Sequence, residues 1–573
     1  MQPVTPKISL LWPRGSASAS IIDAGDAVVI DLELTRFVEA IDNIHEQRVT
    51  LASVLQKFSD DPQVIGYRLD IVEDLLANSD LCYCLKELLP KIDELVRISK
   101  LRFEPSADLE MLISRIDELD LYIQCVNTLA QHFSTTAATL SSAGLVKLKE
   151  IVLEITNTHE FQSLVQELPQ MKAGMEKLAS VTIGVNLDAQ LRPCEAVLLS
   201  INDQKYRAGT ILERLMNKSA RDKYVGVSSL FTINNGSESD EMQNMVFRQA
   251  IINSIGKILR SVIRPVAPLV AKYTRVSAEF LLNLNSEIVF LLASVQLLKT
   301  LQQSGLNICK PQVLAKADRK GNIKGFYNLN LALQKLADSE TDLGIKIVGN
   351  DVVFNDQGRI YILTGPNQGG KTTYTQGVGL AQFMFQLGLY VPGEVAALSP
   401  VDNIFTHFPV EERPNSNLGR MGEECQRLQG IFAKATAHSL VLLNESLSST
   451  SPGEGIYIAK EIVCGLKLLG LRGVYATHFH ELGSSVDRIN ENVPGDSRLV
   501  SLVAGLLAHS QETKGFFQRS FRITPGVPQG MSYAKEIASQ HGVSIEQIIT
   551  TLEDREMIQS RHEVAVNSNW LGD

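Results

Sequence analysis

The chain has 573 residues, of which 44% are hydrophobic and 21% are charged, and its formal net charge is −10. A chain of this length forms more than one domain, and its composition excludes a disordered or fibrous protein. The acidic balance excludes binding of polyanions over the whole surface, so a nucleic-acid site would have to be a local basic patch.

The cysteines and the start of the chain bear on its location. The seven cysteines are scattered and have no metal-ligand spacing, which indicates reduced thiols. The opening sequence MQPVTPKISLLWPRG lacks the charged start and long apolar core of a signal peptide. We therefore expect a cytoplasmic protein.

The first predicted structured region is helical. After an N-terminal segment at residues 1–29, apolar residues recur three and four apart over residues 30–182, as in IGYRLDIVEDLLANSDL. Within this region LELTRFVEAIDNI is amphipathic, so Phe37 is predicted to face a core. The sequence therefore predicts a long helical region ahead of any sheet.

The pattern then changes twice. Residues 183–241 alternate and carry turn residues, which predicts short strands ending in a loop. Residues 242–344 predict returning helices followed by a connector rich in Pro and Gly. Their most apolar stretch, FLLNLNSEIVFLLASVQLL, is interrupted by asparagines and Glu287, which favours a buried helix over a membrane span.

The last large region, residues 345–550, predicts an α/β domain ahead of a C-terminal tail at residues 551–573. Short apolar runs (RIYILTG, SLVLLN and GVYATH) alternate with helical segments. This alternation is typical of a parallel sheet with both faces covered by helices. We find no internal repeat in the chain.

The strongest motif begins where the first of these runs ends. Gly365 to Thr372 match G-x-x-x-x-G-K-[ST], the phosphate-binding P-loop. Its glycines let backbone N–H groups surround phosphates, Lys371 reaches the outer phosphates, and the Thr372 hydroxyl is a ligand for Mg²⁺. An ordinary glycine-rich turn would match this pattern only rarely. The sequence therefore predicts ATP and Mg²⁺ as cofactors, with the phosphates held by Gly365, Pro366, Asn367, Gln368, Gly369, Gly370, Lys371, Thr372 and Thr373.

Sequences around the P-loop resemble the MutS family, the ATPases of DNA mismatch repair. The resemblance lies in NDVVFNDQGRIYILTGPNQGGKTTYTQGVGLAQFMFQLGLYVPGEV, AHSLVLLNESLSSTS, YATHFHEL and ITPGVPQGMSYAKEIA, and in DDPQVIGYRLDIVEDLL and VTIGVNLDAQLRPCEAVLLSIN nearer the start. It implies a multidomain protein with a helical core and lever over 30–182, a short clamp-like β-containing insertion over 183–241, and an ABC-type P-loop ATPase domain. It also implies a homodimer that embraces DNA.

The resemblance implies roles for four further residues. Asn350 would contact the adenine, Glu445 would orient the attacking water, His478 would contact the γ-phosphate region, and Asn444 would help hold the metal. Two have simpler alternatives, because a Glu after a buried strand also caps helices and a lone His is often structural. The nearby His480 is predicted to be structural.

Two positions depart from the family pattern. Asn444 stands where the family has Asp, and its amide oxygen lacks the charge that favours metal binding. Because Glu445 is intact, we expect a working ATPase that needs more Mg²⁺. Gly419 and Arg420 stand where the family has a Ser-Thr pair that reaches the nucleotide of the other subunit. A backbone N–H of Gly419 and the charge of Arg420 could replace that pair, or Arg420 could be an ordinary surface residue.

The family's mismatch-reading domain has no counterpart in this sequence. That domain carries a Phe-x-Glu wedge, and here the lever helices begin almost at once. Phe37 and Glu39 have the wedge spacing but lie in the amphipathic stretch described above, so we interpret the match as coincidence. The resemblance is therefore to a short form that binds DNA without mismatch selectivity.

Two basic clusters could contact DNA phosphates. No Asp or Glu occurs between Met242 and Ala278, and three cations there share a helical stripe. Either cluster could also be a solvated face, and neither has the interleaved aromatic residues of a single-strand binder. Contacts to the backbone of duplex or branched DNA are the more natural interpretation. The candidate residues are Lys205, Arg207, Lys218, Arg221, Lys223, Lys257, Arg260 and Arg264.

Two classes of function follow from these patterns. The first is an ATPase that couples ATP binding and hydrolysis to closure of a homodimer on DNA. The second is a nucleotide-gated scaffold with little or no hydrolysis, which would hold a protein or ribosomal partner and in which Asn444 and Gly419 would mark lost activity.

Overall fold

The computed structural model describes most of the chain, in the ranges that follow. These are residues 8–13, 25–42, 50–100, 108–135, 140–176, 180–187, 189, 193–202, 204–205, 207–208, 225–226, 266–273, 276–340, 342–366, 368–409, 419–447, 451–507, 518–528, 542–543 and 545–555. The chain forms two compact units, one of residues 1–10 and 78–288 and the other of residues 11–77 and 289–573. The predicted helical region 30–182 is thus divided between the two units.

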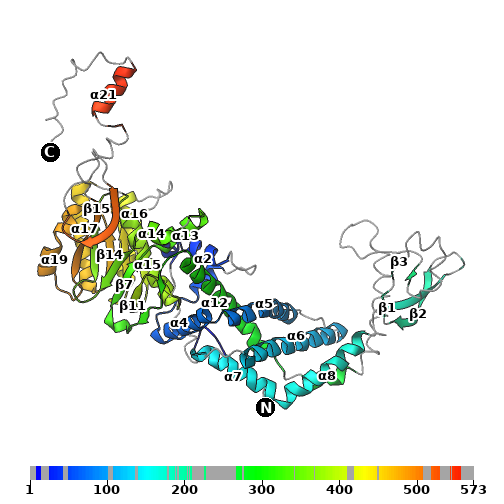
Figure 1. The fold of residues 1–573 in the computed structure, drawn as a ribbon. Helices are drawn as coiled ribbons and strands as arrows, with labels where there is room; N and C mark the ends of the chain where they lie inside the picture. The colour runs from blue at the N-terminus through cyan, green and yellow to red at the C-terminus, as the bar shows by residue number, and fades with distance from the viewer. Residues whose placement is uncertain are drawn as a thin grey trace. The chain divides into compact units, whose positions relative to one another are not determined.

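The first unit is mainly helical, as predicted from the apolar spacing (Figure 1). Its helices bury one apolar stripe each against their neighbours, with Tyr122 of α6 making edge contacts to Phe161 of α8 and Phe280 of α12. The predicted strands follow the helices, and β1 and β2 pair antiparallel while β3 and β4 pair parallel. The elements are α5 (Ser79–Lys100), α6 (Asp108–Thr135), α7 (Ala143–Asn157), α8 (His159–Glu176), β1 (Ser180–Leu187), β2 (Pro193–Asn202), β3 (Arg207–Ala208), β4 (Val225–Gly226) and α11 (Ala267–Lys272).

Helix α12 (Glu279–Gln303) contains the most apolar stretch of the chain. It is the one helix among the described residues that is long and apolar enough to cross a membrane, and 67% of its most apolar window is buried inside the protein. Glu287 accepts hydrogen bonds from the Ser9 hydroxyl and the Leu10 amide, both at 2.6 Å. The Glu287 carboxylate has two hydrogen-bond donors within the protein, and the helix surface is mostly buried. Both observations favour a core helix, as predicted, over a membrane span.

The N-terminal helices of the second unit are α1 (Asp26–Asp31), α2 (Leu34–Asp42), α3 (Leu51–Leu55) and α4 (Pro62–Ala77). Phe37 of α2 is fully buried, and its ring meets Phe383 edge-on at 6.3 Å between centroids. The prediction that Phe37 faces a core is therefore confirmed. Its Phe-x-Glu spacing reflects the amphipathic helix and not an exposed wedge.

A six-stranded sheet organises the second unit (Figure 1). Its order is β12-β13-β14-β9-β15-β16, and every pairing is parallel except that of β15 with β16. The three apolar runs predicted as strands form β9, β13 and β14, and every residue of these strands is buried. The strands are β9 (Ile360–Thr364), β12 (Ile404–His407), β13 (Leu440–Asn444), β14 (Arg472–Ala476), β15 (Leu499–Leu507) and β16 (Gln518–Pro525).

Helices cover both faces of this sheet, as predicted. On one face, Val441 and Leu443 belong to a core cluster with α16 and α17. On the other, α15 packs so closely that a side chain at Gly379 would lie 2.7 Å from Leu442. The covering helices are α15 (Lys371–Gln386), α16 (Arg420–Lys434), α17 (Pro452–Leu469), α18 (His480–Ser484) and α19 (Val486–Asn492), and α21 (Ile545–Asp554) follows the sheet in the chain.

A second, four-stranded sheet was not predicted. Its order is β6-β11-β7-β8, and much of it comes from the stretch predicted as a connector. The strands of this part are two to six residues long, too short to show an alternating pattern. The elements are β5 (Ile308–Cys309), β6 (Gln312–Val313), a 3₁₀ turn (Lys316–Asp318), β7 (Gly321–Phe326), α13 (Leu329–Ala337), α14 (Leu343–Lys346), β8 (Asn350–Phe354), β10 (Val391–Pro392) and β11 (Val395–Leu398).

Candidate functional site

The predicted P-loop joins the end of β9 to the start of α15, the strand–loop–helix context that the motif requires. Gly365 and Gly370 have φ values of +142° and +91°, in a region that other residues rarely adopt. A Cβ at Gly365 would also lie 2.7 Å from the Ala504 Cβ. The glycines therefore let the loop turn under β15 and leave the backbone N–H groups at the start of α15 available to an anion.

Lys371 lies in the floor of this loop. It is 4% exposed, and its Nζ donates to the carbonyls of Gly365 and Pro366 at 3.0 and 3.1 Å. Burial lowers the pKa of Lys371, and the Glu445 carboxylate at 4.0 Å opposes that shift. A desolvated ammonium group beside backbone donors is suited to bind phosphate oxygens.

Two oxygens meet at the predicted metal position. The Thr372 hydroxyl at the start of α15 donates to Asn444 Oδ1 at the end of β13, at 3.1 Å. Mg²⁺ prefers oxygen ligands and keeps several waters, so a hydroxyl and an amide oxygen fit it when phosphate oxygens complete the shell. Both oxygens belong to neutral side chains, and weaker metal binding stays a prediction.

Asn444→Asp is expected to lower the Mg²⁺ concentration that gives half-maximal ATP hydrolysis. A charged acceptor adds roughly 1.5 kcal/mol or more to such an interaction, which corresponds to about tenfold. Magnesium titration of steady-state turnover measures the shift. Asn403→Asp, at the edge of the same sheet where Asn403 caps the amide of Ile404, is the matched control. An unchanged midpoint in Asn444→Asp would remove Asn444 from the metal site.

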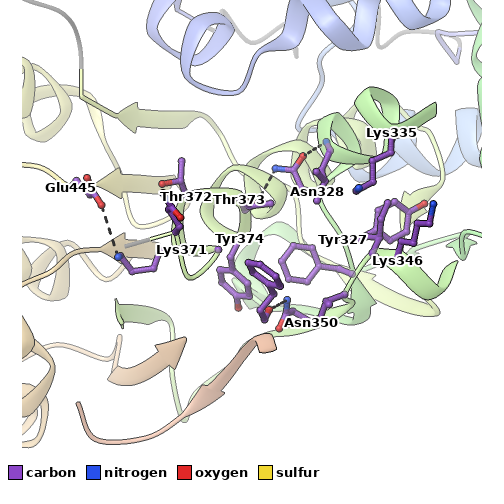
Figure 2. Close-up of a pocket in the computed structure, with 17 residues that line it drawn as sticks. Tyr327, Asn328, Lys335, Lys346, Asn350, Lys371, Thr372, Thr373, Tyr374 and Glu445 are labelled. Atoms are coloured by element: carbon purple, nitrogen blue, oxygen red, sulfur yellow. Dashed lines mark hydrogen bonds and ion pairs between the residues drawn. The ribbon is translucent and has the colours of Figure 1, made fainter. Parts of the chain in front are cut away.

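Glu445 follows Asn444 in a left-handed backbone conformation, with φ of +47°. Its amide donates to the Ala476 carbonyl at 2.8 Å, and its side chain is 35% exposed. The carboxylate is thus directed from a fixed backbone into the space beside Lys371 (Figure 2). A carboxylate in this position can orient and deprotonate a water near bound phosphate.

A cavity of about 530 Å³ extends from the P-loop towards α13 and α14. Figure 2 shows Lys371 and Glu445 at one end of it and Lys335 and Lys346 at the other. The aromatic side chains of Phe326, Tyr327, Tyr374 and Phe521 also line it. With a cation in the P-loop and aromatic side chains in its walls, the cavity has the size and chemistry of a nucleotide site.

Asn350 lines this cavity, but its side-chain amide is already hydrogen-bonded to β16. Its Nδ2 donates to the Phe521 carbonyl at 3.0 Å, and its Oδ1 accepts from the Ile523 amide at 2.7 Å. Asn350 therefore has a structural role at this position. Its contact with adenine stays a prediction.

The two histidines after β14 differ in environment. His478 is exposed and lies 4.6 Å from the Phe479 ring, and it is not among the cavity-lining residues. His480 is half-buried, and burial, with Lys371 and His478 adding smaller effects, lowers its pKa. The γ-phosphate contact of His478 stays a prediction.

Gly419 and Arg420 begin α16, and both are exposed. Arg420 Nε lies 3.8 Å from Glu424 Oε1 on the same helix. An exposed guanidinium at a helix start is available to an anion, and whether that anion belongs to a second subunit stays a prediction.

Two of the eight predicted DNA-contacting residues lie in the described part of the chain. Lys205 is exposed after β2, and Arg207 lies in β3. In the described part of the acid-free stretch, Lys272 is hydrogen-bonded to Glu167. Outside the described residues lie Asn367 of the P-loop and the cations Lys218, Arg221, Lys223, Lys257, Arg260 and Arg264.

Several residues of the site were not identified from the sequence. Asn328 Nδ2 donates to the Thr373 carbonyl and to Gln376 Oε1, both at 2.9 Å, and so fixes the start of α15. Glu424 and His407 contact the loop that carries Glu445. They lie on other elements, and no spacing in the sequence connects them with the motifs.

Two family models match parts of the chain. A family model described as MutS domain V matches residues 361–545, which hold the P-loop, Asn444 and Glu445. A second, described as MutS2 N-terminal domain, matches residues 60–304.

Curated relatives resemble parts of the chain. DNA mismatch repair protein MutS of Prochlorococcus marinus (strain AS9601) is 30% identical over 238 residues, which are 39% of this chain and 25% of that protein. Endonuclease MutS2 of Thermus thermophilus is 32% identical over 33% of this chain and 24% of that protein. DNA mismatch repair protein Msh6 of Homo sapiens is 34% identical over 32% and 14%. The matches thus span a quarter or less of these relatives' lengths.

Proposed function

Since the chain belongs to the MutS family, we propose that it is a cytoplasmic, ATP-hydrolysing DNA-binding protein that closes as a homodimer on DNA. One observation carries this proposal. The carboxyl ends of β9 and β13 bring together four side chains, those of Lys371, Thr372, Asn444 and Glu445. The helical first unit and its β1–β2 pair would supply the lever and clamp.

The residues of the site have distinct tasks in this proposal. Backbone N–H groups of residues 368–373 and the ammonium group of Lys371 bind the phosphates of ATP. Thr372 and Asn444 would hold Mg²⁺, which would neutralise charge on the phosphates. Glu445 orients the attacking water and accepts its proton. Water adds to the γ-phosphorus as the bond to the β-phosphate oxygen breaks, which gives ADP and phosphate.

Steady-state ATP hydrolysis with Mg²⁺, with and without duplex DNA, tests the proposal directly. If Arg420 completes the site of a second subunit, turnover per chain rises with protein concentration as dimers form, and sedimentation follows the same transition. Absence of turnover at every protein, Mg²⁺ and DNA concentration would leave the nucleotide-gated scaffold instead. A strict monomer with full turnover would rule out a shared site.

Binding to DNA is expected to weaken steeply with salt, because it would depend on phosphate contacts. The log–log slope is about −0.9 per phosphate neutralised, so replacing Lys257, Arg260 and Arg264 together by Ala flattens it by roughly 2–3. Mismatched and fully paired duplexes bind about equally, because phosphate contacts carry no sequence information. Titrations of both duplexes at several salt concentrations measure these quantities.

Arg97→Ala with Lys147→Ala is the control for that triple variant. Each of these cations already pairs with an acid on its own helix, Glu94 and Glu150 respectively. This double variant should therefore leave the slope of DNA affinity against salt concentration unchanged. A triple variant with the parent's affinity and slope would make the stripe a solvated face, and a clear preference for a mismatch would contradict backbone binding.

A further inference from the structure

The loop that presents Glu445 has an unfavourable backbone. Glu445 and Leu447 have φ values of +47° and +68°, and neither is a glycine. Residues other than glycine keep such conformations only where the surrounding structure holds them, and they cluster at functional sites. The contacts that hold this loop therefore decide where the Glu445 carboxylate lies.

Strands of the sheet supply three of those contacts. From β14, the Ala476 carbonyl accepts from the Glu445 amide at 2.8 Å, and the Tyr475 hydroxyl donates to the Ser446 carbonyl at 3.2 Å. From β12, His407 Nδ1 lies 2.7 Å from Ser446 Oγ. These contacts hold Glu445 and Ser446 in place. None of the three involves Leu447.

The fourth contact comes from helix α16. Glu424 Oε2 accepts from the Leu447 amide at 2.6 Å, and Leu447 is fully buried. A carboxylate that accepts from a backbone N–H forms a charge-assisted bond, which is stronger than a neutral one. The second oxygen of the same carboxylate lies 3.8 Å from Arg420 Nε at the exposed start of the helix.

From these contacts we propose that Glu424 is a positioning residue for Glu445. It holds the Leu447 amide so that the strained loop keeps the Glu445 carboxylate beside Lys371, and it ties this loop to the first turn of α16. The expected effect on kcat rests on the ATP hydrolysis proposed above. The hydrogen bond between Glu424 and the Leu447 amide can be tested without turnover.

The test compares Glu424→Ala, Glu424→Gln and the control Glu423→Ala. Glu424→Ala removes the acceptor, so kcat falls roughly tenfold to 100-fold, the size of effect expected from displacing a reacting group by about 1 Å. Affinity for a non-hydrolysable ATP analogue stays within about twofold of the parent, because Glu424 is not among the residues that line the cavity. Glu424→Gln keeps an acceptor oxygen for Leu447 and restores most of the lost kcat.

Glu423→Ala removes the same charge from the neighbouring position of α16. Glu423 makes no hydrogen bond to the loop among the described residues, so turnover remains near that of the parent. If Glu424→Gln had a kcat as low as that of Glu424→Ala, the proposal would be overturned. The acceptor oxygen that Gln keeps for the Leu447 amide would then not maintain turnover. Equal losses of turnover and nucleotide affinity in Glu424→Ala would also overturn it.

Hydrogen exchange of the Leu447 amide separates this proposal from that of hydrolysis. Peptides that end on either side of residue 447 report this amide, which exchanges faster in Glu424→Ala than in the parent, Glu424→Gln or Glu423→Ala. Equal exchange in all four proteins would refute the positioning contact. A parent that does not turn over ATP but shows the exchange difference would refute hydrolysis alone.

Discussion

Replacement of Glu445 by Gln or Ala is expected to lower kcat for ATP hydrolysis by roughly 10²–10⁴-fold, the contribution of a positioned general base. The side chain lies beside Lys371 without being part of the P-loop, so ATP still binds. Turnover under saturating Mg²⁺ and equilibrium binding of ATP measure the two quantities separately.

The control for this replacement is Glu491→Gln, an exposed acid on α19 of the same unit. It should leave both kcat and ATP affinity unchanged. If Glu445→Gln hydrolyses ATP at the parent's rate, Glu445 is not the catalytic residue and the site would need another base.

Arg68→Met is expected to be the most destabilising single replacement that we propose. Arg68 of α4 is fully buried, and its guanidinium donates to the carbonyls of Leu11 at 2.9 Å and Leu387 at 3.4 Å and to that of Lys57. It also lies over the Trp12 ring, 4.4 Å from its centroid. Methionine fills part of the volume but removes the hydrogen bonds that Arg68 donates to these carbonyls.

We expect the free energy of unfolding to fall by about 3 kcal/mol. The lost hydrogen bonds to buried carbonyls cost more than is regained when the charged group no longer has to be buried. At about 2–4 °C per kcal/mol, the Tm of the second unit falls by roughly 6–12 °C. Thermal unfolding measures the shift. Arg488→Met removes an exposed arginine from α19 of the same unit and should leave the Tm nearly unchanged. A similar Tm for Arg68→Met and the parent would show that these contacts do not stabilise the unit.

The parts of the fold that were predictable have strong local signals. The fully buried strands β9, β13 and β14 are continuous apolar runs, and the P-loop fixes where one strand ends and a helix begins. The resemblance implied that Thr372 and Asn444 share a metal site, and the structure brings them together although β14 lies between β13 and β9 in the sheet.

The unpredicted parts depend on tertiary contacts. Strand β6 of the second sheet has two residues, which is too few to show any period, so the sequence around it is interpreted as a connector. Glu424 lies 23 residues before Leu447, and their hydrogen bond depends on how α16 packs against the sheet. Likewise, the structural role of Asn350 comes from β16, 171 residues further along the chain.

The pairing of Asn350 with β16 has a consequence for aggregation. Strand β8 is at one edge of its sheet and β16 at the edge of the other, and exposed edges are templates for pairing with another chain. The Asn350 side chain makes the two bonds that a neighbouring peptide group would make, to Phe521 and Ile523. It therefore satisfies these two peptide groups on the edge of β16. Removal of this amide would leave the Phe521 carbonyl and the Ile523 amide without these bonds, so replacement of Asn350 is expected to promote self-association through β16.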